Sequence, residues 1–208
     1  MPMLSFPLTP RFLGQLLELA DVPWCRDAFD EDFRRRGWVR PDAGGETAVG
    51  WLDHWPLGEP GNSWHVVLGE YPGCSRTDDP GIACEEPACH EDSFIAFPLA
   101  YAAIDCVEAG TGLPVDPRHL WGDPLPACAT HRAGATQDDV LACYAEAERL
   151  LRARLGTPLP TAPPVPSDAP ERQTSWQRGN RLVSLFLDEN AANHGQDDWI
   201  GIDIRPLH

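Results

Sequence analysis

Two short segments near the end of the chain have the apolar composition and the spacing of β-strands. They constrain the fold more than any other feature. Residues 181–187 carry apolar side chains at both odd and even positions. Residues 198–205 place Trp199, Gly201 and Asp203 on one side of a strand and three isoleucines on the other. We predict that these two segments pair as an antiparallel hairpin with a long polar connection.

A second hairpin is predicted in the first half of the chain. Residues 46–55 and 63–71 are rich in aromatic and β-branched side chains, which favour strands. Between them, residues 58–62 read GEPGN, a composition typical of turns.

Three amphipathic helices are predicted, over residues 10–20, 24–36 and 136–155. The first begins with a Thr-Pro pair, which supplies a hydroxyl cap and a proline at the first helical position. The third begins with Thr136 and Asp139, which approximate a capping box. A glycine follows the second and the third helix, where it suits a C-terminal cap.

The remaining segments have weaker patterns. Residues 94–97 are predicted to form a short strand, and residues 99–108 an alanine-rich buried helix. Residues 72–92 and 111–135 show little periodicity and are interpreted as loops. Residues 157–170 hold six prolines, which predicts an extended linker.

Together these elements predict an α+β fold in which antiparallel β-hairpins pack against amphipathic helices. We expect a single domain over residues 1–208. The alternative is two helix-hairpin halves, residues 1–135 and 136–208, with the Pro-rich linker 157–170 in the second. Both ends share the order helix, link, Trp-led strand, turn, strand, so an internal duplication is an open hypothesis.

The charge balance restricts the function. The chain carries 32 acidic and 16 basic residues, a net charge of -16, and every basic residue is arginine. Without lysine there is no P-loop lysine and no Schiff-base lysine. Nucleic acid is disfavoured as a partner because its binding depends on a basic surface. A basic protein is the partner that this charge would attract, although acidity can also serve solubility alone.

One cysteine-rich segment has the residue types of a zinc site, namely Cys74, Cys84, Cys89 and His90. Its spacing is unlike that of structural zinc sites, because the cysteines are not closely paired and two candidate ligands are adjacent. A disulfide between Cys84 and Cys89 is a second option, and unligated thiols are the interpretation that the spacing favours. We therefore expect no cofactor, with zinc as the alternative.

Candidate partner-binding residues lie in the same region and beyond it. Asp78, Asp79, Glu85 and Glu86 form two acidic pairs that would meet a basic surface, and Trp121 in a proline-rich segment is a candidate recognition aromatic. The other adjacent acids are interpreted as solvated surface.

No catalytic motif stands out, and cysteines on apolar helical faces are interpreted as small core residues. These are Cys25, Cys106 and Cys143. The first twenty residues lack the pattern of a signal peptide, and no apolar run is long enough to span a membrane. We therefore expect a cytoplasmic protein with reduced thiols. The sequence does not indicate an oligomeric state.

The overall composition, which is small, acidic and tryptophan-rich without a catalytic motif, is similar to that of bacterial immunity and antitoxin-like proteins. The resemblance rests on no motif and transfers no residue. It implies a non-enzymatic protein that binds a basic partner. The alternatives are a metal- or thiol-dependent enzyme that uses the Cys74/Cys84/Cys89/His90 segment, and a housekeeping protein.

Overall fold

The computed structural model describes residues 1–36, 54–55, 64–65, 67–68, 94–102, 125, 127–160, 172–188 and 198–207. In chain order, its helices and strands are β1 (Met3–Ser5), α1 (Pro10–Ala20), α2 (Arg26–Arg36), β2 (His54–Trp55), β3 (Trp64–His65), β4 (Val67–Leu68), β5 (Ile95–Ala102), β6 (Thr130–Arg132), α3 (Gln137–Leu155), β7 (Arg172–Arg178), β8 (Arg181–Asp188) and β9 (Asp198–Pro206).

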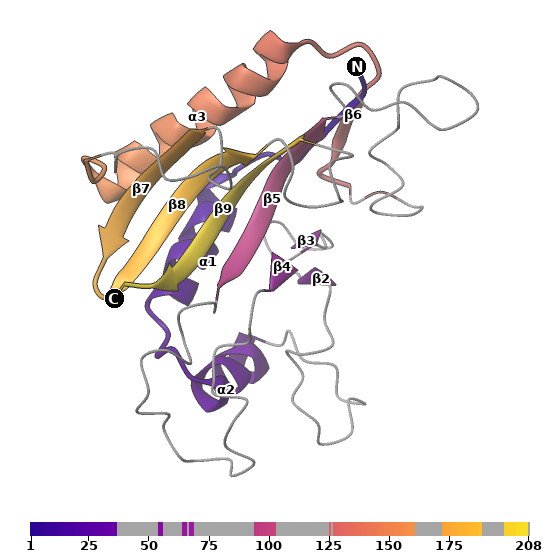
Figure 1. Ribbon diagram of the computed structural model, residues 1–208. Coiled ribbons are helices and arrows are strands. Elements are labelled where there is room, and N and C mark those ends of the chain that lie inside the picture. Colours follow the sequence, from indigo (N-terminus) through magenta and orange to yellow (C-terminus); the bar gives the residue numbers. More distant parts are fainter. Residues whose placement is uncertain are drawn as a thin grey trace.

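Seven strands form one antiparallel sheet in the order β6-β1-β5-β9-β8-β7, with β4 also paired to β5 (Figure 1). The predicted C-terminal hairpin is β8–β9, and β9 lies beside β5 on its other edge. Strands β2 and β3 pair with each other in a separate two-stranded sheet. They lie within residues 46–55 and 63–71, the two segments predicted to form a hairpin. The large sheet combines strands from both ends of the chain, and the division into residues 1–135 and 136–208 stays a prediction.

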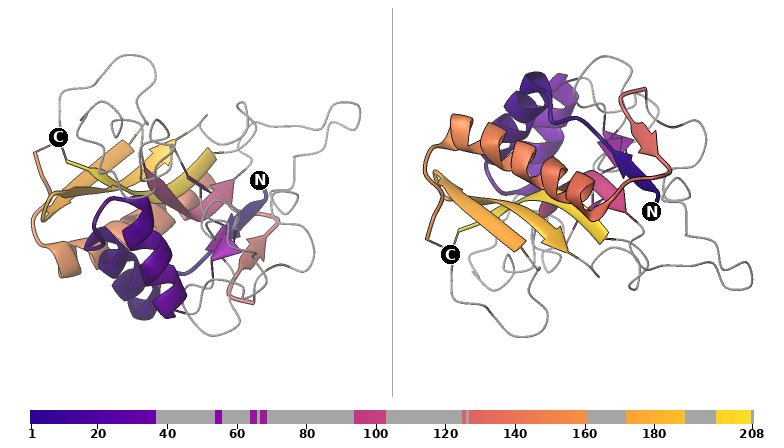
Figure 2. Two further views of the ribbon diagram at one scale, coloured as in Figure 1. Left: turned by 90° about the horizontal axis from the view of Figure 1, so that it is seen from below. Right: turned by 90° about the horizontal axis from the view of Figure 1, so that it is seen from above.

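Helices α1 and α3 lie on the same face of the sheet, whereas α2 lies beyond the end of the strands (Figures 1 and 2). The Phe12 ring of α1 meets the Phe97 ring of β5 edge to face, with centroids 6.0 Å apart. Tyr144 of α3 donates a hydrogen bond of 3.4 Å to the Leu185 carbonyl oxygen of β8. The α+β fold class with helices packed on an antiparallel sheet is therefore confirmed.

The predicted alternation of β9 is also confirmed. Ile202 is the register partner of Phe97 and Leu185, so the three isoleucines of β9 share the helix-covered face and are fully buried. The opposite face, which we call the far face, carries the alternate residues of β9, namely Trp199, Gly201, Asp203 and Arg205.

The predicted helix starts agree with the observed caps. The Thr9 hydroxyl accepts a hydrogen bond from the Phe12 amide at the start of α1. At the start of α3, Thr136 and Asp139 form a complete capping box, and Gly156 with φ of 82° ends this helix. These local signals work because they satisfy backbone groups that no other part of the helix can satisfy.

Two predictions for the middle of the chain are wrong where the structure describes it. Residues 99–102 continue strand β5 instead of starting a helix, because β5 is enclosed between β1 and β9 and pairs with both. Pro98, which has no amide hydrogen, sits at a register irregularity of this strand. The predicted loop 111–135 contains the short edge strand β6, paired to β1.

Strands β1 and β7 were not predicted at all. β7 follows the Pro-rich linker, and the amide of Leu159 in that linker donates a hydrogen bond of 2.8 Å to the Ser175 carbonyl on the outer edge of β7. The described start of the linker thus covers part of an edge strand, which limits further strand pairing there.

Candidate functional site

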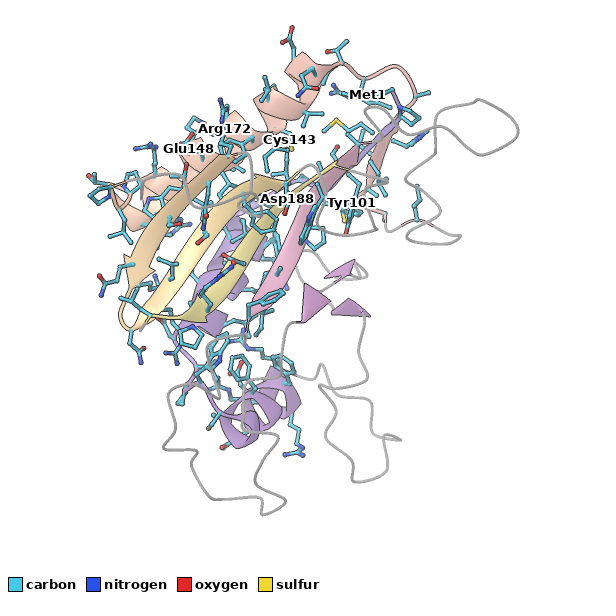
Figure 3. The ribbon with its side chains drawn as sticks, viewed as in Figure 1. Met1, Tyr101, Cys143, Glu148, Arg172 and Asp188 are labelled. Carbon is cyan, nitrogen blue, oxygen red and sulfur yellow. The ribbon has the colours of Figure 1, made fainter. Side chains whose placement is uncertain are left out.

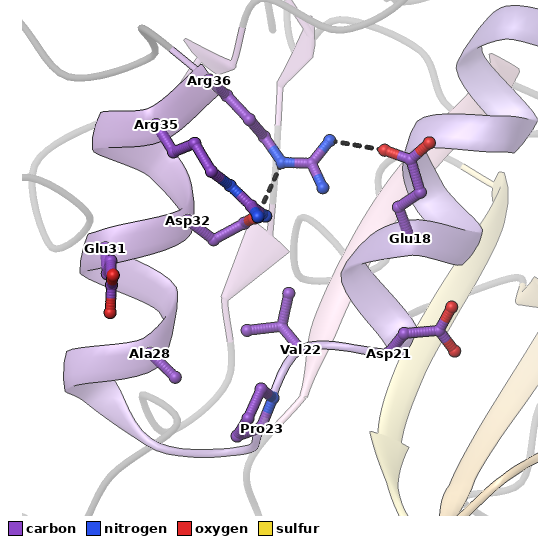
Figure 4. Close-up of a pocket in the computed structure, with 9 residues that line it drawn as sticks. All are labelled: Glu18, Asp21, Val22, Pro23, Ala28, Glu31, Asp32, Arg35 and Arg36. Carbon is purple, nitrogen blue, oxygen red and sulfur yellow. Dashed lines mark hydrogen bonds and ion pairs between the residues drawn. The ribbon is translucent and has the colours of Figure 1, made fainter.

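A cleft of about 770 Å³ lies between the end of α1 and α2 (Figure 4). The last turn of α1 and the following link contribute two acids and an apolar pair, and α2 contributes the facing wall. The nine lining residues are Glu18, Asp21, Val22, Pro23, Ala28, Glu31, Asp32, Arg35 and Arg36.

Ion pairs hold the two walls of this cleft together. Arg36 of α2 donates through Nη1 to Glu18 Oε2 of α1 at 2.8 Å and through Nε to Asp32 within its own helix. Arg35 also pairs with Asp32. The Asp32 side chain is only 4% exposed, so it is a buried carboxylate held by two arginines and not the solvated acid that the sequence suggested.

The charge state of Arg36 follows from these contacts. Burial lowers the pKa of its guanidinium, but hydrogen bonds and Coulomb attraction from Asp32 and Glu18 outweigh burial, and the pKa lies above its ordinary value. The positive charge is therefore permanent. Glu31 is exposed, and no described residue forms an ion pair with it.

The β7–β8 turn anchors the link between α1 and α2. Arg178 of β7 makes a bidentate contact with Asp21, with distances of 2.8 Å and 2.6 Å. Arg181 of β8 donates to the Val22 carbonyl oxygen at 3.1 Å and places its guanidinium 5.1 Å from the Trp24 ring centroid. The floor of the cleft is thereby fixed to the sheet.

This arrangement suits guanidinium and ammonium groups. Glu18 and Asp21 each bind an arginine from another element, and their side chains remain 62% and 56% exposed. Carboxylates with this exposure are accessible to a cation from outside, and paired arginines show that the geometry for such contacts is already present. The apolar floor offers contact area for an alkyl stem.

The charge of the chain is distributed very unevenly. The described residues contain thirteen Asp or Glu and thirteen Arg, out of 32 and 16, which leaves 19 acidic and 3 basic residues in the other segments. The described α+β framework is thus neutral, and the net charge of -16 belongs to the segments outside it.

All residues that the sequence singled out as candidate sites lie outside the described residues. These are the acidic pairs Asp78, Asp79, Glu85 and Glu86, the aromatic Trp121, and the candidate ligands Cys74, Cys84, Cys89 and His90. Their proposed roles in partner binding and in metal binding therefore stay predictions. Within the described part of the chain, no group of His, Cys, Asp and Glu has the arrangement to hold a metal ion.

The cysteines that the structure describes are Cys25, Cys128 and Cys143, and all three are free thiols. Cys143 lies on α3 against the core, and burial raises the pKa of its thiol to about 11, as expected for an inert core residue. Cys25 is exposed, so its interpretation as a core residue is wrong, because the link before α2 turns it outward. Cys106 lies outside the described residues.

The sequence did not identify the cleft residues, because their contacts form only when distant segments of the chain pack together. The acidic cluster at residues 30–32 and the arginines at 34–36 are visible in the sequence, and their spacing of three and four residues indicates ion pairs within a helix. Nothing in the sequence, however, places Glu18 opposite Arg36 across two helices.

No helix among the described residues is long and apolar enough to cross a membrane. Comparisons with protein-family models, with curated proteins and with solved structures each found no match to this chain.

Proposed function

We propose that this protein is a non-enzymatic cytoplasmic binding protein whose acidic segments recognise a basic protein partner, as an immunity or antitoxin-like protein does. The observation that carries the proposal is the acidity of the chain, which has 32 acidic and 16 basic residues and a net charge of -16. Of these, 19 acids and 3 arginines lie in the sequence outside the described residues.

The acidic segments would act mainly on the rate and specificity of association. An excess of charge of one sign steers an oppositely charged partner and can raise association rates by about 10- to 1000-fold at low salt. The four acids Asp78, Asp79, Glu85 and Glu86 lie within eight positions of one another in the sequence and are the first candidates for this role.

The cleft between α1 and α2 supplies a place for close contact. An arginine or lysine of the partner would approach Glu18 on α1, whose side chain is 62% exposed, or Glu31 on α2, which has no ion pair within the described part of the chain. A partner cation at Glu18 would share or replace the contact of Arg36, which keeps its ion pair with Asp32.

The test uses a nona-arginine peptide as a defined basic probe and fluorescence anisotropy as the readout. The acidic-segment variant combines Asp78→Asn, Asp79→Asn, Glu85→Gln and Glu86→Gln. We expect at least a several-fold loss of affinity for this variant, and a smaller difference between the two proteins in about 0.3 M than in about 0.05 M NaCl, because salt screens the lost charges.

A matched control changes the net charge equally within the neutral framework. It combines Asp138→Asn, Glu146→Gln, Glu148→Gln and Asp188→Asn, all outside the cleft. Equal losses for the two quadruple variants would show that the peptide senses only total charge and would contradict the proposal. A third variant, the double substitution Glu18→Gln and Glu31→Gln, tests the cleft. Its affinity for the peptide should be lower than that of the double variant Glu146→Gln and Glu148→Gln, which loses the same charge outside the cleft.

A further inference from the structure

A row of polar side chains crosses three strands on the far face of the sheet. Asp203 of β9 is the register partner of Ser184 of β8, which in turn is the register partner of Ser175 of β7. Ser175 donates a hydrogen bond of 2.9 Å to the Ser184 hydroxyl, and Gln173 donates one of 3.3 Å to the Ser175 hydroxyl. The row therefore runs from a buried acid to an exposed amide at the edge strand.

Asp203 is the unusual member of this row. It is 2% exposed, and Arg205, two residues along the same strand, donates to its Oδ2 atom. The Oδ1 atom is buried and has no hydrogen-bond partner among the residues that the structure describes. A buried carboxylate oxygen without a donor favours protonation, because the neutral acid loses less solvation than the anion.

The electrostatic surroundings of Asp203 are simple within the described part of the chain. Ser184 on β8 and Ala96 on β5 are its cross-strand partners, and neither is charged. Arg205 is the charged side chain in contact with it. Burial raises the pKa of Asp203, and its contacts with Arg205 and Ser184 offset only part of this increase.

Other titratable groups on the far face lie toward the opposite end of β9. Asp188 and Tyr101, which are labelled in Figure 3, belong to the two strands that flank β9 and are register partners of Trp199. His131 lies further out, on β6 opposite Leu4. Trp199 is four positions from Asp203, about 13 Å along a strand, so these groups affect Asp203 only weakly.

We propose that Asp203 is a proton-operated switch in the sheet, which takes up a proton from solvent at Oδ1 on acidification and releases Arg205. The carboxylate becomes a carboxylic acid, and the guanidinium of Arg205 keeps its charge and turns to water. Arg205 is 44% exposed, so it can leave without crossing packed side chains.

The Ser184 hydroxyl allows both states within one fold. A serine hydroxyl has one donor and two acceptor positions, so it can donate to the carboxylate or accept from the acid. One acceptor position is used by Ser175, and the other remains for Asp203. Protonation therefore lets the acid donate to Ser184, and the loss of the Arg205 contact at Oδ2 is tolerated because a neutral carboxyl group costs less to bury than a carboxylate.

The experiment follows two NMR signals of the full chain during a pH titration, the Asp203 carboxyl carbon and the Arg205 Nε–H. We expect both to change with one shared midpoint that lies above the ordinary pKa of an aspartate, about 3.9. In Arg205→Gln the Asp203 midpoint should rise, because a neighbouring positive charge is lost.

The Asp203→Asn variant supplies a test that needs no acid. Asparagine resembles the protonated acid, so at neutral pH the Arg205 signal should already have its low-pH position and should no longer titrate. Asp138→Asn is the control and should leave both curves unchanged. A midpoint for Asp203 at or below the ordinary aspartate pKa of about 3.9, or an Arg205 signal that does not follow Asp203, would overturn the proposal.

Discussion

Gly201 shows how a single residue is constrained by strand register. It faces Phe186 of β8 on the far face, and a Cβ atom built at Gly201 would lie 2.6 Å from Cζ of that ring and 3.0 Å from the Trp199 ring. Phe186 and Trp199 pack edge to face, with centroids 4.6 Å apart. The Phe186 ring therefore occupies the space that a side chain at position 201 would need.

We predict that Gly201→Ala destabilises the protein by about 1–3 kcal/mol, because overpacking forces the aromatic rings out of position. Urea unfolding measures this change. Adding Phe186→Leu should recover part of the loss relative to Phe186→Leu alone, since the two residues are in contact and their effects are not additive.

Gly14→Ala is the matched control. Gly14 lies inside α1 with no atom within 4 Å of a built Cβ. Alanine should stabilise the helix there by up to about 1 kcal/mol, from helix propensity alone. If Gly201→Ala is as harmless as Gly14→Ala, the close approach of Phe186 is not a packing constraint.

Among the secondary-structure elements, α3 shows how residues within a helix and at its ends can specify it. Thr136 and Asp139 cap its start, and Arg149 and Arg152 pair with glutamates three and four positions earlier. The Tyr144 hydroxyl lies 3.0 Å from the Thr174 hydroxyl of β7, which connects the helix to the edge of the sheet. Local signals thus start the helix, and packing orients it.

We predict that Thr136→Ala lowers the free energy of unfolding by about 1 kcal/mol, the usual cost of losing an N-cap side chain. Thermal unfolding of the variant checks this value, and Thr157→Ala, an exposed threonine after the helix, is the control. A loss in Thr157→Ala as large as in Thr136→Ala would contradict a specific role for the cap.

The capping box also predicts a pH dependence. Hydrogen bonds from the backbone and hydroxyl of Thr136, with the charge of Arg132, hold the pKa of Asp139 below its ordinary value. The stability that Asp139 contributes is therefore present above the pKa of the unfolded chain and is lost as pH falls through the lower folded pKa. The difference in Tm between Asp139→Asn and the parent should shrink at acidic pH.

Elements with few apolar positions explain most of the misses. β7 reads RQTSWQR and buries only Trp176 fully, so no alternation stands out in the sequence. A signal was nevertheless present, because the two residues between β7 and β8 are Gly179 and Asn180, and Gly179 has φ of 59°. Two-residue turns with glycine and asparagine are typical of hairpins.

For the whole molecule, the main electrostatic feature is the excess of acids, with a net charge of -16. The described ion pairs are mostly exposed, and exposed pairs contribute about 0–1 kcal/mol each. Repulsion among the excess acids acts over longer distances than these contacts.

We therefore predict that salt stabilises this protein. Screening weakens both the ion pairs and the repulsion among acids, and the repulsion is the larger contribution in a chain with twice as many acids as arginines. The Tm should rise between about 0.02 M and about 0.3 M NaCl. A fall in Tm would show that the framework ion pairs dominate instead. The quadruple variant of residues 78, 79, 85 and 86 should respond less to salt than the parent.

The local features of this protein follow from residues that are close together in the chain. Capping residues, glycine stops and the alternation of β9 act between neighbours in the chain, and α1, α3 and the β8–β9 hairpin were predicted from them. The α+β class followed from these elements.

Only the tertiary structure decided which distant segments meet. Residues 99–102 form a strand because β1 and β9 enclose them, although their composition favours a helix. Likewise, Glu18 and Arg36 define a cleft, and Asp203 becomes a buried acid, only after helices and strands have packed. Burial and charge pairing depend on residues far apart in the chain, and no local pattern records them.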